Sequence, residues 1–214
     1  MKFYYMNHKA YSLSSPMMIR SLDVKNDSFH PCEKSEELLG AEVPNLSAIG
    51  ALMYLANCTR PDINFFVDLS AKYNFAPTRR HWNGIKHILH YLRGPTYMGL
   101  FYSRESKHQL LGYADARYLS DPHKGRSQTR YVFNCNGIAI SWRFVEQTMM
   151  ATSLNHPKIL TIHEASHECI WLRSMIQHIQ ELCGLSSMKG DATILFEDNV
   201  ACIAQIIRVI LKEI

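Results

Sequence analysis

Residues 131–142, YVFNCNGIAISW, contain two short apolar runs separated by Asn136-Gly137. The runs are rich in β-branched and aromatic residues, which favour strands. An Asn-Gly pair favours a type I′ turn, because both central residues of that turn need positive φ. The stretch therefore predicts an antiparallel hairpin with strands over 131–135 and 138–142.

The sequence on either side of this hairpin predicts an α/β domain over residues 97–208. Two apolar runs, 100–102 and 109–113, precede the hairpin and read as strands. A long helical pattern covers about 158 to 183 and ends at Gly184, a favoured helix stop. Residues 193–196 then read as a short strand and 199–207 as a helix. This order of antiparallel strands, long helix, strand and helix suggests that the later strand enters beside the first.

Residues 45–96 predict a separate helical segment. A first helix is expected over 46–57, a second up to about 73, and a third that begins after Thr78, a plausible N-cap. Thr59-Arg60-Pro61-Asp62 has the T-x-x-D form of a capping arrangement at the start of the second helix. Residues 1–44 lack strong periodicity and contain three prolines, so we expect a loosely ordered leader there.

Composition limits where the protein can act. The chain has 214 residues, 47% hydrophobic and 20% charged, with a net charge of +4. No apolar stretch approaches the roughly 18 residues of a membrane span, and the first residues lack the apolar region of a signal peptide. Six cysteines without a C-x-x-C pair indicate free thiols in a reducing compartment. We expect an intracellular protein that is not secreted and has no membrane partner.

The third predicted helix carries cations beside an apolar stripe. The stripe consists of Trp82, Ile85, Leu89 and Leu92. The candidate nucleic-acid-binding residues are Arg79, Arg80, Lys86, His90 and Arg93, with His87 beside them. A row of cations on a rigid helix can follow a phosphate backbone, with affinity supplied by the release of counterions. A solvated helix face is the alternative interpretation.

A second motif suggests zinc chemistry. Residues 163–167 read H-E-x-x-H, in which His163 and His167 can share a Zn²⁺ and Glu164 can act as base. A catalytic zinc usually needs a third protein ligand, and His178 and Glu181 lie too far along the same helix. Surface histidines are the simpler interpretation, and a zinc-dependent hydrolase is kept as an alternative function.

Several blocks of this sequence resemble the Pol polyproteins of copia-type retrotransposons. Residues 47–67, SAIGALMYLANCTRPDINFFV, match the family pattern G-x-L-x-Y-L-x-x-x-T-R-P-D-I. Residues 88–94, ILHYLRG, are similar to the next family block. Similar blocks continue through residues 112–116, 126–129, 140–142, 164–173 and 198–199. The resemblance covers roughly residues 40–206, and 209–214 read as an unrelated tail.

The resemblance implies a helical reverse-transcriptase tail over residues 45–96, followed by an incomplete ribonuclease H-like domain over 97–208. In the family this domain cleaves the RNA strand of RNA–DNA hybrids with two Mg²⁺ ions held by four carboxylates. Asp115 and Asp198 match the first and third of these ligands. The implied partner is therefore nucleic acid, with no small-molecule substrate. No Y-x-D-D pair occurs, so polymerase activity is not expected.

This chain departs from the family pattern at the other two ligands. Lys158 stands where the family has the second carboxylate, and a cation there repels Mg²⁺. Glu164 does not replace it, since six helical residues place it about 9 Å away on another face. The fourth carboxylate is expected after residue 206, where the similarity ends. Three further family positions are altered, at Arg117, Arg130 and Glu146.

We therefore expect a catalytically inactive fragment with residual nucleic-acid binding. Two further alternatives remain: an active ribonuclease H with an altered set of ligands, and a co-opted RNA-binding module.

Overall fold

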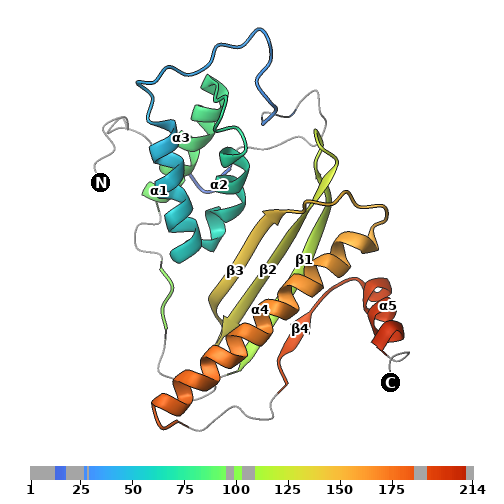
Figure 1. The fold of residues 1–214 in the computed structure, drawn as a ribbon. Helices are drawn as coiled ribbons and strands as arrows, with labels where there is room; N and C mark the ends of the chain where they lie inside the picture. Colours follow the sequence, from blue (N-terminus) through green and yellow to red (C-terminus); the bar gives the residue numbers. More distant parts are fainter. Residues whose placement is uncertain are drawn as a thin grey trace. The chain divides into compact units, whose positions relative to one another are not determined.

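The computed structural model describes residues 13–17, 27, 29–94, 99–102, 109–185 and 192–210 (Figure 1). The chain forms two compact units, residues 1–99 and 100–214. Residues 1–12, 18–26 and 28 of the expected leader, and residues 211–214 of the expected tail, lie outside the described residues. No helix within the described ranges is long and apolar enough to cross a membrane.

The first unit is helical, as the sequence predicted. It contains α1 (Asn45–Cys58), the 3₁₀ turn η1 (Pro61–Ile63), α2 (Asn64–Ala71) and α3 (Arg79–Arg93). Their apolar faces meet in one core, to which α1 contributes Leu52, η1 contributes Ile63 and α3 contributes Ile85. Thr78 is the N-cap of α3, as predicted, and its backbone N–H donates to Nδ1 of His81 at 3.0 Å.

The T-x-x-D segment does not form the expected capping arrangement, and this prediction was wrong. Asp62 instead accepts two hydrogen bonds from Arg60, at 2.8 and 2.6 Å. It also accepts one from the hydroxyl of Tyr91 at 2.8 Å. The carboxylate is used in this way because Pro61 begins a single 3₁₀ turn, with Arg60 and not Thr59 before it. Asp62 therefore ties this turn to the last turn of α3.

Residues 29–39 of the expected leader make specific contacts with the helices. Phe29 is buried, and its carbonyl accepts a hydrogen bond from the hydroxyl of Tyr73 at 2.7 Å. Glu36 pairs with Arg80 of α3 at 2.5 Å. Leu39 donates its backbone N–H to the carbonyl of Pro77. These contacts anchor this part of the leader on α3 and on the segment between α2 and α3.

The second unit is a four-stranded mixed sheet with helices. It contains β1 (Leu110–Asp121), β2 (Arg126–Cys135), β3 (Ile138–Glu146), α4 (Asn155–Leu182), β4 (Ile194–Phe196) and α5 (Val200–Ile210). The strand order is β3-β2-β1-β4, with β4 parallel to β1 and the other pairs antiparallel. The prediction that the later strand lies beside the first is confirmed.

The β2–β3 hairpin is confirmed, whereas two strand predictions need correction. Asn136 and Gly137 have φ of 54° and 79°, as a type I′ turn requires. Residues 100–102 are not a strand, and Tyr102 donates its hydroxyl to the carbonyl of Ala139. β1 continues eight residues past its predicted end at 113, because it pairs with β2 as far as Asp121.

α4 covers one face of the sheet (Figure 1). Ala165 and Leu172 of this helix pack in one core with Leu110 of β1 and Phe133 of β2. The helix begins at Asn155, three residues before the predicted start, with Pro157 in its first turn. Proline is tolerated there because the first backbone N–H groups of a helix have no partner within the helix. The early start places Lys158 on a regular part of the helix.

Candidate functional site

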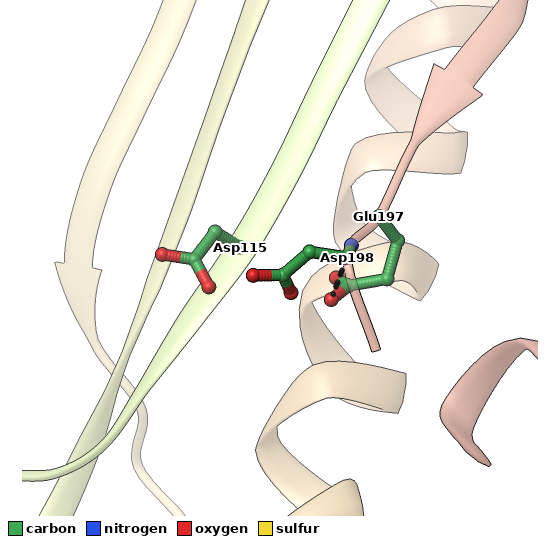
Figure 2. A group of neighbouring side chains, drawn as sticks. All are labelled: Asp115, Glu197 and Asp198. Carbon is green, nitrogen blue, oxygen red and sulfur yellow. Dashed lines mark hydrogen bonds between the residues drawn. The ribbon is translucent and has the colours of Figure 1, made fainter. Parts of the chain in front are cut away.

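Three carboxylates meet where the parallel pair of strands ends. The β1–β4 ladder stops at Tyr113 and Phe196, whose rings stack with centroids 5.1 Å apart. Asp115 lies two residues further along β1, and Glu197 and Asp198 follow β4 directly (Figure 2). One oxygen from each carboxylate lies within 4.8 Å of the others. Asp115 and Asp198, which match two ligands of the family, therefore lie close together, with Asp115 inside β1.

The ammonium group of Lys158 lies among these carboxylates. Its Nζ is 2.7 Å from an oxygen of Asp115, 2.8 Å from one of Glu197 and 2.6 Å from one of Asp198. The Lys158 side chain is only 12% exposed. One cation thus connects β1, the start of α4 and the segment after β4.

A second cation, Arg130, pairs with Asp115 from the outside of the cluster. Arg130 lies directly opposite Asp115 on β2, and its guanidinium donates to that carboxylate. Cross-strand neighbours are close enough for such a pair. The residue that the resemblance marked as altered therefore neutralises one of the three carboxylates.

The charges shift the pKa values of the cluster. Burial alone would lower the pKa of Lys158, but hydrogen bonds to Asp115, Asp198 and Glu197 outweigh burial and hold this pKa well above its usual value. The hydrogen bond from Lys158 lowers the pKa of the exposed Asp198. Burial raises the pKa of Glu197, against the opposing effect of Lys158. Lys158 therefore stays charged across the ordinary pH range.

A buried polar network positions Lys158. Gln147, just after β3, donates its side-chain amide to the Pro157 carbonyl at 2.9 Å and to the Thr129 hydroxyl at 3.1 Å. Thr161, in the second turn of α4, donates to the same Thr129 hydroxyl at 3.3 Å. Gln147, Thr129 and Thr161 are all buried. Buried polar groups need their partners, so this network sets where the first turns of α4 lie on the sheet.

The residues present do not fit the two Mg²⁺ ions that the resemblance implies. Mg²⁺ requires near-octahedral oxygen ligands at about 2.0–2.1 Å, whereas the Lys158 ammonium already binds one oxygen of each carboxylate. Glu164 lies elsewhere on α4 and faces Arg143 at 3.8 Å. Positions 207–210 hold no carboxylate, and Glu213 lies outside the described residues.

The alternative zinc motif has two ligands but lacks a third. His163 and His167 are both exposed on α4, with their Nε2 atoms 3.3 Å apart. Glu164, the expected base, faces Arg143. Within the described residues, the acidic cluster is the only group of three or more potential metal ligands. The geometry therefore provides no catalytic zinc site in that part of the chain.

The predicted basic residues all lie on α3, but their surroundings differ. Arg79 and Arg93 are exposed, and Lys86 and His90 are half-buried. At 3.6 residues per turn these four positions fall within an arc of about 60° and span about 21 Å. Arg80 lies off this row and donates to Glu36 and to the carbonyl of His30. Its charge is therefore already neutralised within the unit.

Sequence reasoning missed Glu197 and the pairing of Arg130 with Asp115. Glu197 directly precedes Asp198 after a short apolar run, so a second carboxylate at this strand end was a readable signal. The role of Arg130 had no local signal, because it depends on the register between β1 and β2.

The sequence is similar to an effector protein and to several retrotransposon Pol polyproteins. It is 37% identical over 130 residues to Secreted RxLR effector protein 161 of Plasmopara viticola, covering 61% of this chain and 92% of that protein. It is 38% identical over 139 residues to the Retrovirus-related Pol polyprotein from transposon TNT 1-94 of Nicotiana tabacum. It is 30% identical over 131 residues to the Retrovirus-related Pol polyprotein from transposon RE2 of Arabidopsis thaliana.

The chain corresponds to a small part of these Pol polyproteins. The matches cover 65% and 61% of this chain but only 10% and 9% of the TNT 1-94 and RE2 proteins. No family model matches the sequence. No solved structure matches it either.

Proposed function

We propose that this retrotransposon-derived chain, which belongs to the family of Secreted RxLR effector protein 161, is a copia-type Pol fragment with an inactive ribonuclease H-like domain. In this proposal residues 45–96 are the tail of a reverse transcriptase. Residues 97–208 are the ribonuclease H-like part. The fragment retains weak binding to RNA–DNA hybrid or other nucleic acid through α3 of the first unit.

The topology of the second unit supports the ribonuclease H-like assignment. Three antiparallel strands, a long helix and a strand parallel to the first follow in the order that the resemblance implies. The two aspartates at family ligand positions come from β1 and from the end of β4, and they converge as a carboxylate site requires.

The position of Lys158 carries the proposal that the domain is inactive. Two-metal hydrolysis needs divalent cations at the point where the carboxylates meet, to activate water and to stabilise the leaving oxygen. At this point the chain holds an ammonium group, hydrogen-bonded to all three carboxylates. An ammonium with a raised pKa holds its proton and does not generate a nucleophilic water. Lys158 therefore offsets part of the negative charge of the cluster but supplies no catalytic metal ion.

A cleavage assay tests this proposal. The full chain is incubated with an RNA–DNA hybrid labelled on the RNA strand, in Mg²⁺ and separately in Mn²⁺. We expect no cleavage above a protein-free blank. Metal-dependent cleavage that is abolished by Asp115→Asn would refute the proposed inactivity, because it would assign the cleavage to this cluster and not to a contaminating nuclease.

The basic row on α3 supports the proposed nucleic-acid binding. Arg79, Lys86 and Arg93 lie along one face of a helix whose opposite side is held by the core. Such a row depends on charge and spacing and does not require the carboxylate cluster. We expect sequence-independent binding with a dissociation constant in the micromolar range or weaker, which weakens steeply as salt rises.

Fluorescence anisotropy across a salt series tests this binding. Changing Lys86 and Arg93 to Ala should lower affinity and flatten the salt slope by about one unit per lost phosphate contact. Lys34→Ala is the control, because it removes an exposed cation from the same unit outside α3. An unchanged slope in the double variant, or an equal change in the control, would show that the row is only a solvated face.

A further inference from the structure

Lys158 has the surroundings of a bound cation, although it belongs to the chain. An ammonium group has three N–H donors and no acceptor. The three carboxylates offer it one oxygen each, at 2.6 to 2.8 Å, from segments 39 to 43 residues away in sequence. Its donors are therefore fully used by one small cluster (Figure 2 shows the three carboxylates).

The carboxylates need a cation in order to stay together. Like charges a few ångströms apart repel, and the repulsion grows as the groups are withdrawn from water. The side chain of Glu197 is only 3% exposed, and its Oε2 is buried with no hydrogen-bond partner. Arg130 contacts Asp115, so it does not balance Glu197 and Asp198 directly.

We propose that Lys158 is the resident cation of this cluster, which joins β1, α4 and the end of β4 in place of a divalent ion. The second unit then folds without metal, and removal of this one ammonium group converts the cluster into a Mg²⁺-binding site. The unpartnered Oε2 of Glu197 supplies a further oxygen that Lys158 leaves unused. This proposal holds whether or not the chain binds nucleic acid.

Two substitutions expose the carboxylates in different ways. K158M removes the charge and keeps an unbranched side chain of similar length, which leaves three carboxylates without their central cation. K158E adds a fourth carboxylate at the same position. K158R is the matched control, because its guanidinium retains a positive charge at this position.

Thermal unfolding of the full chain provides a readout that is independent of catalysis. Each protein is melted in EDTA and in millimolar MgCl₂, with ionic strength matched by NaCl. The melting temperatures of the wild type and of K158R should differ by less than about 1 °C between EDTA and MgCl₂. In EDTA, K158M and K158E should have lower melting temperatures than the wild type. Mg²⁺ should raise these melting temperatures by about 4 °C or more, as expected for an ion that binds only the folded state.

The comparison between variants decides the outcome. If neither K158M nor K158E is stabilised by Mg²⁺, including by being unfolded in both conditions, the proposal is wrong. The proposal is also wrong if Mg²⁺ raises the melting temperature of the wild type as much as that of K158M, since Lys158 would then not occupy the position at which Mg²⁺ binds. Either result would leave the proposed inactivity to be judged separately by the hybrid-cleavage assay.

Discussion

The change Gly112→Ala tests how the parallel strand β4 is seated against β1. A Cβ at position 112 would lie 2.6 Å from Cε1 of Phe133 and 2.7 Å from Cδ1 of Leu195. Carbon atoms in ordinary contact are about 3.5–4.0 Å apart, so each neighbour would have to move by about 1 Å. Phe133 is fully buried in the core beneath α4 and has little room to move.

Overpacking of this kind costs about 1–3 kcal/mol of the free energy of unfolding. For a unit of this size, about 1 kcal/mol corresponds to about 4 °C in melting temperature, so we expect a decrease of about 4–12 °C. β4 has only three residues and carries Leu195, so it should shift more easily than Phe133. The segment bearing Glu197 and Asp198 would move with it.

Calorimetry, with fluorescence from Trp142 and Trp171 to identify the second unit, measures the effect. Phe133→Leu removes the clashing ring atom, so its cost should be smaller in the Gly112→Ala background than in the wild type, with a coupling of about 1 kcal/mol. The control is Gly50→Ala at an exposed position of α1, where a Cβ meets nothing within 4 Å and Ala should stabilise by about 0.5–1 kcal/mol. Additive effects of Gly112→Ala and Phe133→Leu would refute the steric argument.

Two further outcomes are expected. His81 is buried, which lowers its pKa below the ordinary value of 6.5, and its Nδ1 accepts from Thr78 while Nε2 lies 3.0 Å from the carbonyl of His30. Because the unfolded chain binds the proton more readily, the free energy of unfolding of the first unit should be highest above about pH 6.5 and should decrease as the pH falls below this value. Urea unfolding across pH should show this loss of stability in the wild type and not in His81→Gln. An equal loss in both proteins would show that protonation of other groups causes it. Asn199 caps α5, with its side-chain oxygen accepting from the Cys202 N–H at 2.9 Å, so Asn199→Ala should cost about 1 kcal/mol. Denaturant unfolding checks this value, and a cost near zero would contradict the capping role.

The sequence alone determined those turns and helices that depend on residues close together in the chain. Asn136-Gly137 predicted the turn between β2 and β3, because positive φ at two successive residues is a property of those residue types. Thr78 predicted the start of α3, because capping involves only the next three residues. The apolar spacing predicted the face of α3 that carries Trp82 and Ile85 to the core.

The sequence also predicted part of the site. Asp115, Asp198 and Lys158 were singled out together through resemblance, and they lie within hydrogen-bonding distance in the structure. The resemblance did not identify Glu197 as the third carboxylate or Arg130 as the partner of Asp115. It placed Lys158 at a ligand position but did not identify its hydrogen bond to Glu197.

Tertiary structure decided these points because they depend on distances between segments that are remote in sequence. The partner of Asp115 follows from the register of β1 against β2. The reach of Lys158 follows from the buried network of Gln147, Thr129 and Thr161, which sets the position of α4 on the sheet. Local patterns report backbone preference and the side that faces the core, whereas hydrogen bonds between distant charged groups exist only after β1, α4 and β4 have packed together.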